Sequence, residues 1–172
     1  MSISKTLTGV ALTAGLLAFG ATASDAATKV KLMPYVSGVN APTAMVQPAG
    51  DDRKFVVEQF GHIKIIDKAG NLLPSPFLDI RNKIVTQFHD FDERGALGLA
   101  FHPDFKKNGK FYVSYSTIID FQGDLGKMLW WDHTNVVEEF TVSADDPNKA
   151  NPNSGRIISS IDWPQFNHNG HW

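Results

Sequence analysis

Residues 96–117, ALGLAFHPDFKKNGKFYVSYST, place two β-rich runs on either side of a proline turn. The runs are Ala96–Phe101 and Lys110–Thr117. Between them, Pro103-Asp104 and Asn108-Gly109 are dipeptides of the kind that end one strand and start the next. The stretch therefore predicts two consecutive strands.

The same plan occurs once earlier in the chain. Met45–Pro48 is followed by a polar turn and then by Lys54–Val57, in the manner of Ala100–Pro103 and Lys110–Val113. The two prolines are 55 residues apart, and the phenylalanines that open the second runs are 56 apart. A period near this length, filled by about four short strands, is typical of propeller blades. On the repeat alone, a sandwich or another barrel stays open.

The rest of the chain also favours strands. Further short runs are predicted at Phe55–Gln59, His62–Ile66, Asn135–Val142 and Arg156–Ile161. A turn-rich stretch, residues 145–153, separates the last two. Beyond the N-terminus no window of a dozen residues has a clean 3.6-residue apolar period. The predicted fold class is all-β.

Composition excludes several classes of protein. The chain has 172 residues, a formal net charge of −2 and no cysteine. A mildly acidic surface lacks the basic footprint that binds nucleic acid. Without cysteine, neither disulfides nor a covalently attached haem can form.

The N-terminus has the features of a secretory signal peptide. Lys5 gives a short positive region, Leu7–Phe19 is uncharged and apolar, and Ala21-Thr22-Ala23 supplies the small residues of a cleavage site. The apolar run is too short to span a bilayer. We expect a signal peptide at 1–23, with cleavage as late as Ala27, a mature domain over 24–172, and a periplasmic or secreted protein. A buried N-terminal helix is the alternative.

Several motifs together resemble one family. They are Val57-Glu58-Gln59-x-Gly61-x-Ile63, Pro76–Ile80, Asp92–Phe105 followed by Asn108–Val113, and Pro164–Gly170. In this order they are similar to the glucose/sorbosone dehydrogenase family, which includes the soluble quinoprotein glucose and aldose sugar dehydrogenases. The resemblance implies a six-bladed β-propeller, of which this chain would supply about the first two blades.

The resemblance also implies an activity. Members oxidise an aldose at the anomeric hydroxyl and pass hydride to pyrroloquinoline quinone (PQQ), with calcium as a second cofactor. A cytochrome or a quinone would be the electron acceptor. Because the residues that hold PQQ and calcium lie in later blades of the family, we expect this truncated chain alone to bind neither stably and to be inactive.

His168 is the candidate catalytic residue. The resemblance aligns Asn167-His168-Asn169-Gly170 with the family's catalytic motif and makes His168 the general base. Neutral imidazole accepts a proton near operating pH, which suits that role. Without the resemblance, a loop histidine beside asparagines is typical of a solvated turn.

Glu93 and Arg94 are the candidate cofactor-binding residues. The loop before Gly95 faces the cofactor in the family, where the position of Glu93 is often glutamine. PQQ carries three carboxylates, so Glu93 would be repelled unless a cation offsets its charge, whereas Arg94 could pair with a carboxylate. The alternative is a solvated acidic loop, since His89, Asp90 and Asp92 lie close by in sequence.

No metal ligands are predicted. Asp146 and Asn148 resemble the start of a calcium loop but lack its glycine and distal glutamate. A second function stays open, a non-enzymatic propeller module that binds a carbohydrate or protein partner, because a fold does not fix its chemistry.

Overall fold

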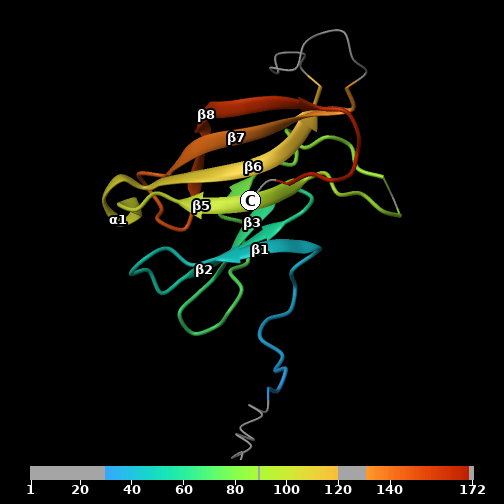
Figure 1. The fold of residues 1–172 in the computed structure, drawn as a ribbon. Coiled ribbons are helices and arrows are strands. Elements are labelled where there is room, and N and C mark those ends of the chain that lie inside the picture. Colours follow the sequence, from blue (N-terminus) through green and yellow to red (C-terminus); the bar gives the residue numbers. More distant parts are fainter. Residues whose placement is uncertain (1–29, 89, 120–130, 171–172) are drawn as a thin grey trace, which may run out of the picture. The chain divides into compact units, whose positions relative to one another are not determined.

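The computed structural model describes residues 30–88, 90–119 and 131–170, and the expected signal peptide lies outside them. All elements belong to the unit Pro34–Trp172. Two antiparallel four-stranded sheets follow one another along the chain (Figure 1). The first contains β1 (Pro42–Val46), β2 (Lys54–Glu58), β3 (His62–Ile66) and β4 (Leu78–Asp79). The second contains β5 (Ala96–Phe101), β6 (Lys110–Ile118), β7 (His133–Val142) and β8 (Ala150–Trp163).

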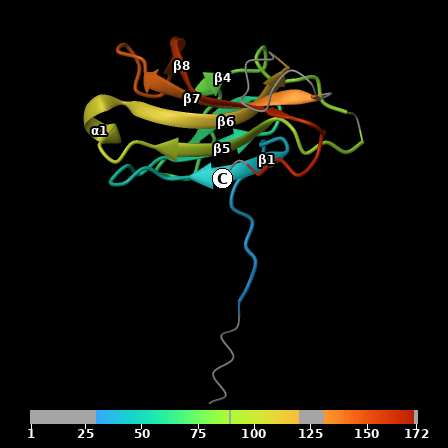
Figure 2. The same cartoon turned by 45° about the horizontal axis from the view of Figure 1, so that its top comes forward.

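In both sheets the strand order equals the sequence order, which is the arrangement of propeller blades. The predicted repeat corresponds to the first hairpin of each sheet. Met45 pairs with Val56 in one hairpin, and Ala100 pairs with Tyr112 in the other. The described chain is therefore all-β and forms two blades, and its one short helix, α1 (Phe105–Asn108), lies between β5 and β6 (Figure 2).

A layer of aromatic rings joins the two sheets. Phe77 follows β3 and lies 4.9 Å from Phe55 of the first sheet and 5.0 Å from Phe111 of the second, measured between ring centroids. All three are at most 2% exposed. The alternation of β6 directs Phe111, Val113 and Tyr115 into this core and turns Tyr112 and Ser114 to the opposite face.

Backbone hydrogen bonds also cross between the sheets. The Ala96 N–H donates to the Gln59 carbonyl at 2.8 Å, and the Ala150 N–H donates to the Phe77 carbonyl at 2.8 Å. These bonds fix the loop before β5 and the start of β8 against the first sheet. In the described residues, no helix is long and apolar enough to cross a membrane.

Candidate functional site

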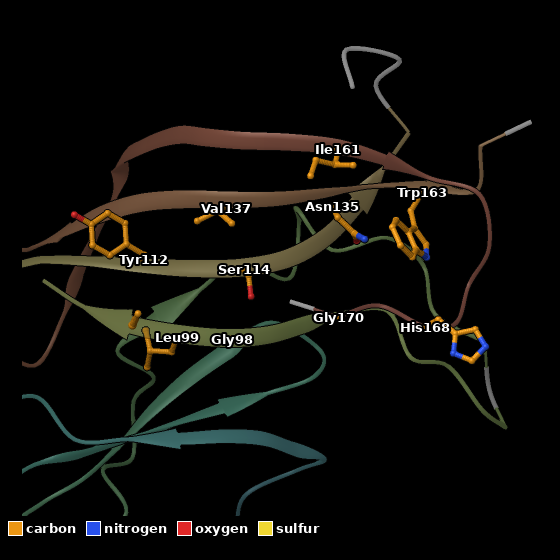
Figure 3. A pocket seen from close by; sticks show the side chains of 11 residues that line it. Gly98, Leu99, Tyr112, Ser114, Asn135, Val137, Ile161, Trp163, His168 and Gly170 are labelled. Carbon is orange, nitrogen blue, oxygen red and sulfur yellow. The ribbon is translucent and has the colours of Figure 1, made fainter. Parts of the chain in front are cut away.

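A pocket of about 450 Å³ lies on the face of the second sheet that points away from the aromatic core (Figure 3). Tyr112, Ser114 and Asn135 line its floor, and Trp163 and His168 lie at one end. No lysine or arginine of the described chain lines it. The pocket therefore offers rings and neutral polar groups, with His168 as the group able to accept a proton.

His168 lies on the segment that follows β8. Its side chain is exposed, and its φ of 60° is in the left-handed region, which is uncommon for a residue with a Cβ. Such a conformation persists only where the surroundings hold it. Just before His168, the Trp163 indole N–H donates to the Asn167 carbonyl at 3.0 Å.

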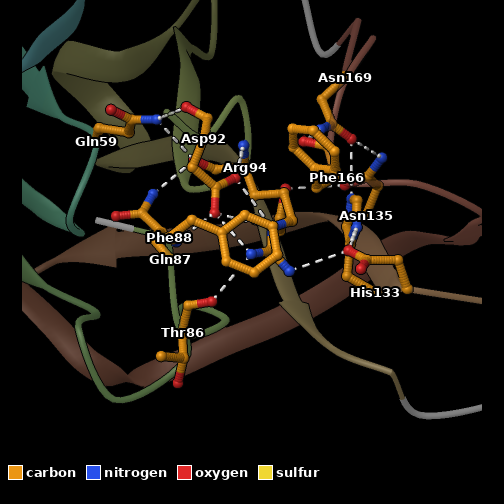
Figure 4. A network of polar contacts seen from close by, with 12 residues as sticks. Gln59, Thr86, Gln87, Phe88, Asp92, Arg94, His133, Asn135, Phe166 and Asn169 are labelled. Carbon is orange, nitrogen blue, oxygen red and sulfur yellow. Dashed lines mark hydrogen bonds and ion pairs between the residues drawn. The ribbon is translucent and has the colours of Figure 1, made fainter. Parts of the chain in front are cut away.

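Asn169 anchors the other side of His168, and Figure 4 shows its contacts with His133 and Asn135. Its Oδ1 lies 2.8 Å from Nε2 of His133 and 3.1 Å from Nδ2 of Asn135, and its own Nδ2 donates to the Phe166 carbonyl at 3.0 Å. His133 is fully buried at the start of β7. The loop that carries the candidate base is thus tied to the framework of the second sheet.

Glu93 contacts this loop directly. Its Oε2 accepts a hydrogen bond from the backbone N–H of His168 at 2.5 Å, although the two residues are 75 positions apart in sequence. A charge-assisted bond of this kind is stronger than a neutral one. The structure therefore brings Glu93 and His168 together, with the carboxylate acting on the backbone rather than on the imidazole.

Arg94 is already committed to protein partners. Its guanidinium binds both carboxylate oxygens of Asp92, at 2.9 and 2.6 Å, and one oxygen of Asp132 at 3.0 Å. It also lies 4.5 Å from the Phe88 ring centroid, and its side chain is 4% exposed. Burial raises the pKa of Asp92, but the hydrogen bonds from Arg94 and from the Phe88 backbone N–H, together with the charge of Arg94, outweigh this and hold that pKa below its usual value. Arg94 therefore holds parts of the protein together, and its buried guanidinium has little access to a ligand.

The loop before β5 is built to fit one conformation. Gln59 donates from Nε2 to the carbonyls of Asp92 and Arg94, at 2.7 and 2.9 Å. Gly95 has a φ of 130°, and a Cβ there would overlap the Gln59 carbonyl and the Gln87 amide. Glycine suits this position because it adopts a positive φ without strain and has no Cβ to clash with these groups. The motif Glu93-Arg94-Gly95 thus forms a loop that Gln59 holds by hydrogen bonds and that contacts His168 through Glu93.

Aromatic contacts close the gap between this loop and the segment after β8. Phe166 packs edge-on against Phe88, with centroids 5.4 Å apart, and against Phe91 at 6.4 Å. Phe88 and Phe91 are otherwise exposed, at 55% and 62%. The loop and the segment therefore meet through three rings as well as through the Glu93 bond.

Sequence reasoning named His168, Glu93 and Arg94 but missed His133, Asp132, Asn135 and Asn169 as their supports. His133 opens a strand, so a pattern of alternating residues gives it no special mark. His89, in the predicted acidic loop, lies outside the described residues. Within the described residues, no group of three or more His, Cys, Asp or Glu side chains is placed to hold a metal ion.

The chain is similar to both enzymes and a binding protein. Mouse Hedgehog-interacting protein is 37% identical over 131 residues, which are 73% of this chain and 18% of that protein. The apo aldose sugar dehydrogenase of Escherichia coli superimposes with a TM-score of 0.52 at 18% identity, over 71% of this chain and 30% of that one.

The PQQ-bound aldose sugar dehydrogenase of Streptomyces coelicolor gives a TM-score of 0.53 at 15% identity, over 75% of this chain and 33% of that one. At these identities the two structures show a shared fold. The chain spans about a fifth of the Hedgehog-interacting protein and about a third of the solved dehydrogenases. The family model "Glucose / Sorbosone dehydrogenase" matches residues 39–158. With two blades of the expected kind, this match shows that the chain belongs to the glucose/sorbosone dehydrogenase family.

Proposed function

We propose that this chain supplies the general base of a sugar dehydrogenase site, with His168 as the base. The observation that carries the proposal is the fixed loop: the Glu93 carboxylate and the His133–Asn169 pair hold the backbone on both sides of an exposed imidazole at the end of a pocket. Pre-positioning a base in this way lowers the cost of proton transfer in the transition state.

In this proposal the substrate is an aldose, and a ring nitrogen of His168 takes the proton of its anomeric hydroxyl. PQQ, which the Streptomyces coelicolor structure contains, would supply the hydride acceptor. A cytochrome or a quinone would then take up the electrons.

The described residues fit such a cofactor only in part. They provide a base and a flat Trp163, but no lysine or arginine of the described chain lines the pocket, and Arg94 is buried against Asp92 and Asp132. Three carboxylates need cationic partners. We therefore propose that these cations, and any calcium ligands, come from the remaining length that the solved relatives have, and that the 172-residue chain alone does not oxidise sugar.

We further propose that residues 24–172 are the mature domain and that the protein is exported to the periplasm or beyond the cell. The signal-peptide pattern of the sequence supports this assignment.

A second candidate function has an observation of its own. The similarity to Hedgehog-interacting protein, at 37% identity, favours a module that binds a protein partner and performs no chemistry. Such a module needs no exposed base, so the two functions differ in what they require of His168.

The test uses a form of the protein as long as the solved relatives, loaded with PQQ and calcium. We expect sugar-dependent dye reduction, and we expect His168→Gln to lower turnover roughly 10²–10⁴-fold while changing PQQ affinity much less. His102→Gln is the matched control, since His102 lies in the turn between β5 and α1 and bonds Asp104 and Asn108. Absence of any sugar oxidation by the loaded parent would favour the binding module.

A further inference from the structure

We infer that His133 is a positioning residue that donates hydrogen bonds through both ring nitrogens and so fixes the loop of the proposed base. The inference rests on the proposed function for the role of His168, and on the contacts of His133 for everything else. Its ring is fully buried between Asp132 and Asn169, 35 residues before His168 in sequence.

The orientation of the Asn169 amide determines the proton at Nε2. The Phe166 carbonyl lies 3.0 Å from Nδ2 of Asn169, and a carbonyl oxygen can only accept. The amide oxygen of Asn169 must then face Nε2 of His133 at 2.8 Å and Nδ2 of Asn135 at 3.1 Å. Because an amide oxygen is also only an acceptor, Nε2 of His133 carries a proton.

The Asp132 carboxylate determines the proton at Nδ1. Its Oδ1 lies 2.8 Å from Nδ1 of His133 and also accepts a bond from the Arg94 guanidinium at 3.0 Å. A carboxylate paired with arginine is ionised and donates nothing, so the proton of the second bond belongs to Nδ1. With both nitrogens protonated, the ring carries a positive charge.

The charged groups around the ring agree with this assignment. Asp92 pairs with Arg94, Arg94 pairs with Asp132, and Asp132 contacts Nδ1 of His133, so a protonated His133 would extend this alternation of negative and positive charges. Three other titratable groups belong to the same region. Asp162 on β8 accepts a hydrogen bond from the Thr134 hydroxyl on β7. Glu93 and His168 meet at the loop itself. In a neutral ring, one nitrogen would carry a lone pair that faces an oxygen of Asp132 or Asn169, and neither oxygen has a proton to donate.

The loop of His168 is the element that responds. The Asn169 side chain is the support on the C-terminal side of His168, and loss of the Nε2 donor would leave it with its bonds to Asn135 and Phe166. The Glu93 bond would remain on the other side. His133 thus acts through Asn169 on the direction of the His168 ring.

The experiment uses the whole chain labelled with ¹⁵N. We expect the His133 ring at pH 6–7 to show two nitrogens that each bear a hydrogen. His102 is an internal reference, because its Nδ1 accepts from the Asp104 N–H at 3.0 Å and therefore shows one bare nitrogen when that bond is present. A bare nitrogen on His133 at pH 6–7 would overturn the inference.

Two variants test the action on the loop. Asn169→Ala removes the side-chain bonds to His133, Asn135 and Phe166, and it should increase the fast backbone motion of residues 167–170 in ¹⁵N relaxation. His133→Gln keeps a donor toward Asn169 and should leave the loop ordered. Equal relaxation in Asn169→Ala and the parent would overturn the positioning role. The ring-nitrogen signals and the relaxation need no sugar oxidation. The positioning role of His133 and the catalytic role of His168 can therefore fail independently of each other.

Discussion

Glu93 gives the backbone of His168 a charged acceptor, and this contact defines its role at the scale of a single residue. Because hydrogen bonds to charged groups contribute about 1.5–3 kcal/mol, Glu93→Ala should reduce the protection of the His168 amide against hydrogen exchange roughly tenfold or more. Glu93→Gln retains a neutral acceptor, so its His168 amide should have a protection between those of the parent and of Glu93→Ala.

Asp145→Asn is a matched control, because Asp145 is an exposed acid in the turn between β7 and β8. It should leave the His168 amide unchanged. Unaltered protection in a folded Glu93→Ala would show that the 2.5 Å contact does not hold in solution.

Asp79 makes a residue-scale prediction about pH. Hydrogen bonds from the Arg81 side chain, followed by those from its backbone and the charge of His62, lower the pKa of Asp79 from 3.8 to about 2. A lowered folded pKa means that the group stabilises the fold above pH 3.8, and that this contribution is lost as the pH falls toward 2.

The Asp79 side chain is 40% exposed, so solvent screening limits its contribution to about 0.2–1 kcal/mol. Asp79→Asn should lower the free energy of unfolding slightly at pH 7 and flatten its fall between pH 4 and 2, measured by urea titration. Parallel curves for parent and variant over this range would contradict the assignment.

The candidate site could be predicted from sequence only where a motif carried the information. Asn167–Gly170 pointed to His168, and Glu93-Arg94-Gly95 pointed to the loop that contacts it. That Arg94 faces Asp92 and Asp132 could not be predicted, because Asp132 is 38 residues away and only the folded sheet brings it close. The contact between His133 and Asn169 could not be predicted for the same reason, because these residues are 36 positions apart in sequence.

At the scale of elements, the buried Glu138 of β7 bonds to β6 and to the loop before β5, and β8 packs closely over it. Its carboxylate accepts from the Tyr115 hydroxyl at 2.7 Å and pairs with Lys83 at 2.6 Å. Burial, and then this hydrogen bond, raise the pKa of Tyr115. Gly155 on β8 leaves room for the carboxylate, since a Cβ there would overlap Oε1 of Glu138.

Gly155→Ala should therefore lower the free energy of unfolding by about 1–3 kcal/mol, the usual cost of overpacking. The measurement is urea unfolding monitored by circular dichroism. Gly170→Ala is the control, because a Cβ at Gly170 meets nothing within 4 Å, and it should be near neutral. A neutral Gly155→Ala would mean that Glu138 can move aside without loss.

Strands with strong β-branched or aromatic character could be predicted closely. His62–Ile66 and Ala96–Phe101 have the predicted bounds, and β6 and β7 differ by one or two residues. The last strand was predicted too short, because Asn151, Pro152 and Asn153 are turn residues, yet β8 begins at Ala150. β8 is the outer strand of its sheet, where a proline need not donate a hydrogen bond to a neighbouring strand. The pairing of β7 with β8 also shifts register between Glu139 and Thr141, which accommodates the irregular start of β8.

At the scale of the whole molecule, the aromatic layer between the sheets holds the two blades together. Phe77 touches rings of both sheets, so Phe77→Ala should cost about 3–5 kcal/mol of stability. Phe60→Ala should cost little, because Phe60 is 46% exposed. Thermal unfolding of both variants would measure the difference, and equal melting temperatures would show that Phe77 does not join the sheets.

Chemical rescue of His168→Ala tests the central claim, that the fixed His168 loop presents the proton acceptor for sugar oxidation. The assay measures dye reduction at saturating sugar by the PQQ-loaded form as long as the solved relatives. We predict a loss of roughly 10²–10⁴-fold that added imidazole partly restores, whereas sodium chloride of equal ionic strength does not. Near-normal turnover by His168→Ala without imidazole would contradict the account and remove His168 from the chemistry.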